Sequence, residues 1–292
     1  PAQPRTAESI GGGTQEHARR LMRILAPLTL IAILAVSAST PFLGHEYFQR
    51  WFSMPRVLFT AQVPLVICIL TWRFARSLRR KFVVSVELDP PRGAEPGVLI
   101  ERAQYCKENE VDAINVADGP RASARMSAQA LCILLQEKVG IDTILHYTCR
   151  DRNLLGIQSD LLGAHALGLR NILAITGDPP KLGDYPDATA VYDVDSIGLI
   201  RIMDHLNHGC DLAGNLIGPA LGLHVGCGAD PSKPDMEKEV RRLEAKVGAG
   251  AEYVMTQPVY DPRTLERFCS MIRHLDVPLL VGILPLYSHR NA

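Results

Sequence analysis

From residue 81 onward, short apolar runs alternate with longer amphipathic stretches. Two of these stretches, 96–110 and 234–250, have helical patterns, and in the second Val240, Leu243 and Val247 recur at helical spacing. Aliphatic and β-branched residues dominate the short runs, which predicts buried strands. The runs lie at 82–88, 112–117, 141–148, 171–177, 222–228, 252–257 and 277–284. A regular strand-then-helix order predicts parallel strands covered by helices.

Seven such units favour a (β/α)8 TIM barrel over an open sheet. The pattern of an eighth unit does not appear before Ala292. A barrel without its last unit would leave two unpaired strand edges. We therefore expect residues 81–292 to form a C-terminally truncated TIM barrel that lacks this last unit.

Residues 1–80 have a different pattern. Residues 24–43 carry no charge over a length that can span a bilayer, and 55–72 form a second run without charge after Arg56. A buried core helix or a signal sequence are the alternatives, but two runs so close together favour a transmembrane hairpin. Arginines flank both outer ends, which places these ends on the cytoplasmic side. We expect 1–80 to anchor a cytoplasmic barrel in the inner (plasma) membrane.

The charge balance and the cysteines narrow the function classes. The 292-residue chain has a formal net charge of zero, so a nucleic-acid partner is not expected. Seven cysteines without metal-ligand spacing favour reduced thiols, and no His/Asp/Glu cluster predicts a metal. No lysine ends a predicted strand, which argues against a Schiff-base aldolase.

Polar residues follow the carboxyl ends of the predicted strands, where barrel enzymes carry their chemistry. The first strand ends in Glu87, the second in Asn115 and Asp118, and the fourth in Asp178; the third, fifth and sixth lead into HYTCRDRN, GCGADP and TQPVYD. Each residue alone has a structural explanation, such as a turn or cap at Asp178 or a loop hydroxyl at Thr148. Their convergence on one rim predicts a functional site.

Four stretches resemble a known family: VSVELDPPRG, ADGPRASARMSA, TQPVYDPRTLERF and the long stretch from ILHYTCRDRN to VYDVDSIGLI. They look like methylenetetrahydrofolate reductases, and most like the reductase module of bifunctional homocysteine S-methyltransferase/methylenetetrahydrofolate reductase proteins. The resemblance covers residues 81–292. The methyltransferase module expected upstream is replaced by residues 1–80, which resemble about two helices of subunit II of cytochrome bd ubiquinol oxidases.

The resemblance implies an enzyme with FAD that uses NADH or NADPH to reduce 5,10-methylenetetrahydrofolate to 5-methyltetrahydrofolate, which feeds methionine synthesis. It implies that Glu87 and Asp178 are catalytic, and that Gln257 and Tyr260 bind the substrate. The implied FAD-binding residues are His146, Thr148, Thr176, Gly177, Asp178, Tyr192, Asp195 and Lys246. Where the family usually has a hydroxyl residue at the end of the second strand, this chain has Ala117.

The residues around Glu87 fit the acid that this reaction needs. The five-membered ring of the folate must open before a hydride can arrive, and ring opening calls for a general acid. Glu87 stands between apolar strand residues and Pro90–Pro91. Such surroundings desolvate a carboxyl, raise its pKa and keep it protonated near neutral pH.

Two other hypotheses stay open at this point. One is an inactive chimera of a quinol oxidase fragment and a partial barrel, and the other is a flavin-free pterin-binding barrel that transfers methyl groups. Lys246 has its own alternative, a solvated lysine on a helix. The sequence leaves open the choice between NADH and NADPH and the oligomeric state, with a homo-oligomer among the options.

Overall fold

The computed structural model describes residue 78 and residues 81–284. Its strands are β1 (Ser85–Leu88), β2 (Ala113–Val116), β3 (Asp142–Thr148), β4 (Asn171–Ile175), β5 (His224–Ala229), β6 (Tyr253–Pro258) and β7 (Leu279–Gly282). They form one sheet in which every strand pairs in parallel with its neighbours in the chain. The prediction of seven parallel strands is confirmed, and each predicted run overlaps one of them, although β5 and β6 each extend one residue beyond the predicted end.

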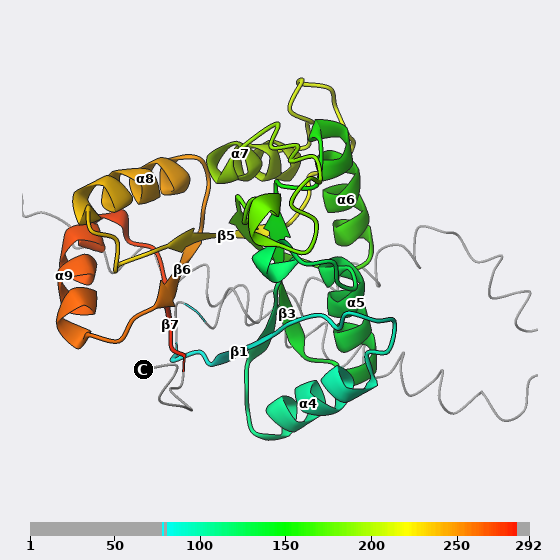
Figure 1. Cartoon of the computed structure of the whole chain (residues 1–292). Helices are drawn as coiled ribbons and strands as arrows, with labels where there is room; N and C mark the ends of the chain where they lie inside the picture. The colour runs from blue at the N-terminus through cyan, green and yellow to red at the C-terminus, as the bar shows by residue number, and fades with distance from the viewer. Residues whose placement is uncertain (1–77, 79–80, 285–292) are drawn as a thin grey trace, which may run out of the picture. The chain divides into compact units, whose positions relative to one another are not determined.

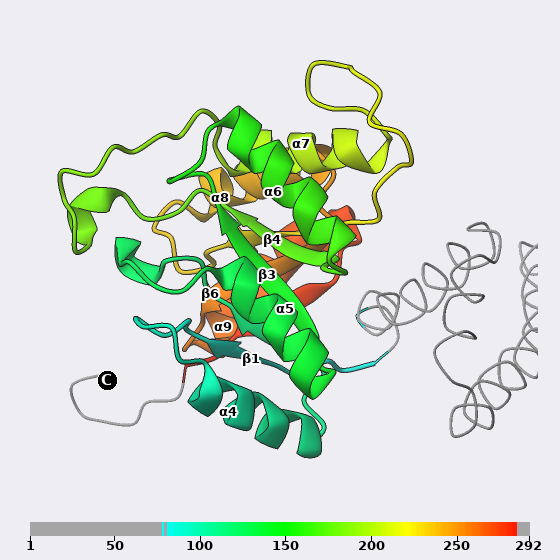
Figure 2. The same cartoon turned by 90° about the vertical axis from the view of Figure 1, so that its right-hand side faces the viewer.

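Helices follow the strands and lie around the outside of the curved sheet (Figures 1 and 2). They are α4 (Gly97–Glu108), α5 (Ala128–Val139), α6 (Leu154–Ala166), α7 (Ser196–Asn207), α8 (Met236–Gly248) and α9 (Pro262–Ile272). Side-chain oxygens accept from backbone N–H groups at the starts of five of them, and these caps are Ser127, Asn153, Asp195, Asp235 and Asp261. The caps satisfy donors that the first helical turn leaves unpaired, so they set where each helix begins.

The sheet has apolar residues on both faces, as expected for parallel strands covered by helices. Alternate strand residues pack against the helices in the larger core cluster. The remaining strand positions face inward and form a smaller cluster of Ala113, Ile144, Leu173, Tyr253 and Leu280. Tyr253 fits there because β5 has a glycine opposite its ring: a Cβ on Gly226 would lie 2.2 Å from a ring carbon.

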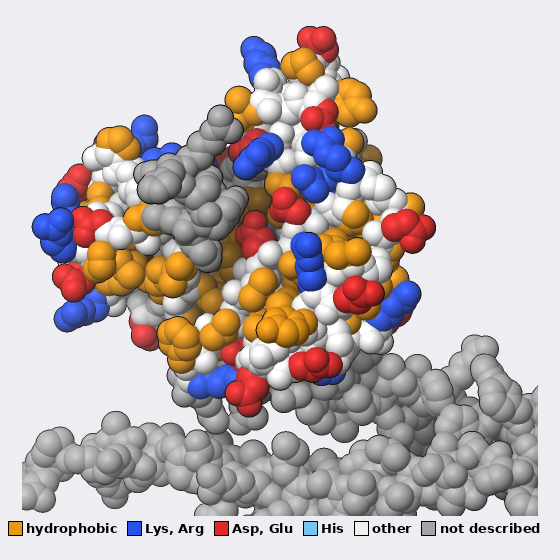
Figure 3. Space-filling view, turned by 60° about the horizontal axis from the view of Figure 1, so that its bottom comes forward, with side chains coloured by type: hydrophobic (Ala, Val, Ile, Leu, Met, Phe, Trp, Pro, Cys, Tyr) orange, Lys and Arg blue, Asp and Glu red, His pale blue; other side chains and the backbone are white. Residues whose placement is uncertain are grey.

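The architecture is a seven-stranded half-barrel of the TIM type. Among the described residues β1 pairs only with β2 and β7 only with β6, so the sheet does not close on itself there. Figure 3 shows a face that is hollowed near its middle, where hydrophobic and acidic side chains meet. No helix within residues 81–284 is long and apolar enough to cross a membrane. The predicted spans at 24–43 and 55–72 lie outside the described residues.

Candidate active site

A cleft of about 780 Å³ lies at the carboxyl ends of β4, β5 and β6. Five of the residues predicted for the site line it: Thr176, Asp178, Lys246, Gln257 and Tyr260. These residues come from three different βα units, and only the parallel arrangement of the strands brings them together. The convergence expected from the strand ends is therefore present for these positions.

Glu87 lies on β1 and does not line this cleft. Its strand neighbour Leu88 packs against the helices, so the Glu87 side chain faces the inside of the half-barrel. By its accessible surface Glu87 is an exposed residue, although protein surrounds its carboxyl on several sides. Burial of the carboxyl raises the pKa of Glu87, and the negative charge of Asp89 adds to this effect. The pKa direction expected from the sequence is present in the structure.

His146 points from β3 into the half-barrel and is only 7% exposed. Burial lowers the pKa of His146 to about 4, although the charge of Asp118 acts in the opposite direction. The imidazole is therefore neutral at pH 7. Its Nε2 atom is buried and has no hydrogen-bond partner among the described residues. A buried ring nitrogen without a partner is costly, and a bound ligand could satisfy it.

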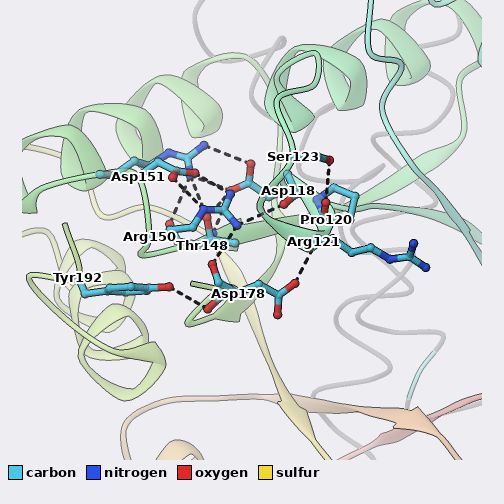
Figure 4. Close-up of polar contacts among 12 residues, drawn as sticks. Asp118, Pro120, Arg121, Ser123, Thr148, Arg150, Asp151, Asp178 and Tyr192 are labelled. Carbon is cyan, nitrogen blue, oxygen red and sulfur yellow. Dashed lines mark hydrogen bonds and ion pairs between the residues drawn. The ribbon is translucent and has the colours of Figure 1, made fainter. Parts of the chain in front are cut away.

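Thr148, at the end of β3, is held by a carboxylate from the end of β2 (Figure 4). Its Oγ1 donates to Asp118 Oδ2 at 2.9 Å, and its backbone N–H donates to the same oxygen at 3.1 Å. The Arg152 guanidinium donates to Asp118 Oδ2 at 2.7 Å and also lies 4.4 Å from the centroid of the Tyr147 ring. The Thr148 hydroxyl proton is committed to Asp118, and its Oγ1 also accepts from Arg152 Nη1 at 3.3 Å, so this side chain can offer a ligand only one lone pair.

Arg150 joins the loops that follow β2 and β4. It is 4% exposed, and its Nη1 donates to the backbone oxygens of Gly119 at 3.2 Å and Asp178 at 3.4 Å. Arg121 N–H donates to Asp178 Oδ2 at 3.2 Å, which fixes the direction of that carboxylate (Figure 4). Both carboxylate oxygens of Asp178 remain acceptors, as orientation of a ligand N–H group requires.

Gly177 has a backbone conformation that favours glycine. Its φ is +93°, and a Cβ there would lie 3.0 Å from the Thr148 Cβ. A side chain would therefore be strained and would also crowd the rim. Tyr192 OH donates to the Gly177 oxygen at 3.1 Å, so Tyr192 holds this turn from the loop before α7.

Lys246 and Asp195 both contact other protein groups near the cleft. Lys246 is 7% exposed, and its Nζ donates to the Gly228 oxygen at 2.6 Å, so the alternative of a solvated helix lysine is wrong. Burial lowers the pKa of Lys246. Asp195 caps α7 through the N–H groups of residues 197 and 198 and lies 3.7 Å from the Arg242 guanidinium. Lys246 keeps two N–H donors for a ligand.

Sequence reasoning missed the roles of Arg150 and Arg152. It placed Asp118 at a strand end but did not pair it with a cation. The charged residues in DG (118–119) and CRDRN (149–153) were the available signal. The sequence could not show which of the two arginines contacts which loop. Within residues 81–284, no group of three or more His, Cys, Asp or Glu side chains could hold a metal ion.

Comparison with known proteins decides the family. The sequence pattern of the family described as methylenetetrahydrofolate reductase matches residues 73–292. The chain belongs to the methylenetetrahydrofolate reductase family. A probable methylenetetrahydrofolate reductase (NADPH) of Caenorhabditis elegans is 28% identical over 218 residues, which cover 71% of this chain and 31% of that protein. A 5,10-methylenetetrahydrofolate reductase of Pectobacterium carotovorum is 23% identical, with 73% of this chain and 67% of that protein covered.

This chain covers only part of its longer relatives, and it shares its fold with a solved structure. The chain spans only 25% to 31% of the length of three eukaryotic relatives from this reductase family. Among solved structures, a 2,3-dimethylmalate lyase of the PEP mutase/isocitrate lyase superfamily has a TM-score of 0.51 at 13% identity, with 76% of each chain covered. That likeness supports the fold alone.

Proposed function

We propose that this reductase-family chain catalyses the reduction of 5,10-methylenetetrahydrofolate to 5-methyltetrahydrofolate, with FAD as cofactor and NADH or NADPH as reductant. The observation that carries the proposal is the convergence of Thr176, Asp178, Lys246 and Gln257 on one cleft. These are positions at which the family resemblance implies contacts with cofactor or substrate. The product would feed methionine synthesis.

The residues present fit FAD. His146 Nε2 is buried without a partner among the described residues, and Lys246 Nζ has two N–H donors free beside the cleft. Gly177 leaves the rim open because it has no side chain. We propose that His146, Thr148, Thr176, Gly177, Asp178, Tyr192, Asp195 and Lys246 hold the cofactor. FAD, when bound, would relay a hydride from the nicotinamide to the folate.

Glu87 would supply the proton. A neutral Glu87 donates its proton to the folate nitrogen that leaves the ring carbon as the five-membered ring opens, and that nitrogen keeps the electron pair of the broken bond. The products of this step are a Glu87 carboxylate and an iminium on the folate, whose carbon then accepts the hydride. Asp178 would orient the pterin through its N–H groups, and Gln257 and Tyr260 would contact the folate.

The test is a comparison of the two half-reactions in Glu87→Gln by stopped-flow absorbance on the FAD-loaded, full-length protein. We expect the folate half-reaction to slow by about 10²–10⁴-fold, the usual loss for a general acid, and flavin reduction by the nicotinamide to stay unchanged. In wild type the folate half-reaction should fall as pH rises through the raised pKa of Glu87, and this limb should vanish in the variant.

Two further variants accompany this test, one for comparison and one as a control. Asp178→Asn should affect both half-reactions modestly, because it changes both pterin orientation and the charge near the flavin. Glu101→Gln, on the exposed side of α4, should change neither. Equal slowing of both half-reactions by Glu87→Gln would assign Glu87 a structural role. Folded wild-type protein that stays colourless after FAD addition would contradict the cofactor assignment.

The domain arrangement is a separate proposal. We propose that residues 81–292 are a reductase module of the bifunctional type and that residues 1–80 are a membrane hairpin related to the quinol oxidase subunit. The support is the sequence alone: the quoted motifs for the first part and the two charge-free runs for the second.

A further inference from the structure

Asn115, on β2, is a buried amide with one half of its hydrogen-bonding capacity unused. It is 6% exposed, and its Nδ2 donates to Ser85 Oγ on β1 at 3.2 Å. Its Oδ1 is buried and has no hydrogen-bond partner among the described residues. A buried acceptor without a donor is unfavourable, because it has lost its hydrogen bonds to water. A neighbouring side chain that donates to Asn115 Oδ1 would therefore stabilise this position.

Glu87 is the neighbour that can supply this donor. The register of β1 and β2 places Glu87 directly beside Asn115. Ser85 stands two residues before Glu87 on the same strand, so its contact with Asn115 shows that Asn115 and Glu87 project from the same face of the sheet. Paired strands lie about 4.8 Å apart, which brings the ends of the two side chains within reach of each other.

The chemistry of the two groups selects one protonation state. An ionised carboxylate only accepts hydrogen bonds and cannot pair with an amide oxygen, whereas a protonated carboxyl donates through its O–H. We propose that Asn115 is a positioning residue, whose Oδ1 accepts the O–H of neutral Glu87 and so keeps the proton on that side chain and fixes its direction. The acid role of Glu87 rests on the proposed function, but the pairing does not.

Few charged groups compete with this contact. Asp89 is the charge that acts on Glu87, and it lies 3.9 Å from the Arg125 guanidinium, whose Nη1 also donates to the Pro90 oxygen. His146, which also faces the inside of the half-barrel, is neutral at pH 7. A neutral acceptor beside Glu87 therefore acts in the same direction as its surroundings.

The test follows the proton on Glu87 directly, by infrared difference spectra of the full-length protein across a pH series, with Glu87→Gln used to assign the carboxyl band. We expect Asn115→Ala to lower the midpoint of Glu87 protonation by roughly 0.5–1 pH unit, the effect of one lost hydrogen bond to the neutral form. The pH limb of the folate half-reaction should move by the same amount, and flavin reduction should not respond.

Ser85→Ala is the matched control, because it removes the other partner of the same amide and leaves Oδ1 in place. Its midpoint should equal that of wild type. An unchanged midpoint of Glu87 protonation in Asn115→Ala overturns the proposal. A raised midpoint overturns it too, because it would show that the amide donates to the carboxylate.

Two further measurements keep the proposal falsifiable. If Asn115→Ala does not fold, the wild-type band decides: a band at the wavenumber of a carboxyl free of hydrogen bonds overturns the pairing. If wild type reduces no folate, the proposed function fails, while the infrared titration still decides the role of Asn115.

Discussion

Among single residues, His146 shows how burial sets the charge of a side chain. The unfolded chain takes up a proton on this histidine at the ordinary pKa of 6.5, whereas the folded protein does so only near pH 4. Folding is therefore opposed by His146 as the pH falls below 6.5, and this contribution to stability is fully present only above that value. The same burial leaves a neutral imidazole for ligand contacts at pH 7.

A stability measurement checks this assignment. Between pH 7 and pH 5, His146 should cost the apo protein roughly 2 kcal/mol of unfolding free energy, and His146→Gln should lose correspondingly less over this range. Urea unfolding at both pH values, followed by circular dichroism, gives the difference. Parallel curves for wild type and His146→Gln would contradict the buried, neutral state.

Among the elements, the ends of β2 and β3 are tied together by charge. Asp118 accepts from Thr148 and Arg152, and Arg152 also donates to Asp160 at 3.1 Å, the carboxylate that accepts from Tyr147 OH at 3.0 Å. The Asp118 side chain is 9% exposed and that of Arg152 20%. Removal of one partner from such a pair leaves the other buried and uncompensated.

Asp118→Asn should therefore destabilise the protein by about 3 kcal/mol, well above the cost of a surface ion pair. The matched control is Asp184→Asn, which breaks the pair with Arg92 between side chains that are 62% and 38% exposed. That change should cost less than about 1 kcal/mol. Urea unfolding of both variants measures the two values. Equal, small losses would show that the β2–β3 network carries no stability.

The strands and the network differ in how far the sequence could predict them. Each strand was predictable because its apolar run is local and the βα order fixes parallel pairing. Lining positions such as Asp178 and Gln257 followed from strand ends and from the family motifs. The partners of Arg150 and Arg152 were not predictable, because each guanidinium could reach several loops and only the folded chain brings Asp118 and Gly119, after β2, next to them. For Glu87, the sequence predicted the direction of the pKa but not its place outside the cleft.

At the scale of the whole molecule, the membrane hairpin predicted for residues 24–72 lies outside the described residues and stays a prediction. A cysteine at position 44, Gly44→Cys, would sit in the loop between the runs 24–43 and 55–72. We expect it to react with an impermeant maleimide from the outer side, because the arginines place both ends in the cytoplasm. A cysteine at Thr14 gives the matched inner position. Labelling of Gly44→Cys from the cytoplasmic side alone would exclude this topology.

The order of the strands has a consequence for synthesis on the ribosome. Every strand pairs with its chain neighbours, so the sheet can grow in the direction in which the chain emerges. The rim residues Thr148 and Asp178 emerge on the order of several seconds before Lys246 and Gln257. During that interval Lys246 and Gln257 are not yet available to bind a ligand. Thr148 and Asp178 have partners that emerge earlier still, because Thr148 donates to Asp118 and Asp178 accepts from the Arg121 N–H. These contacts do not depend on the second half of the cleft.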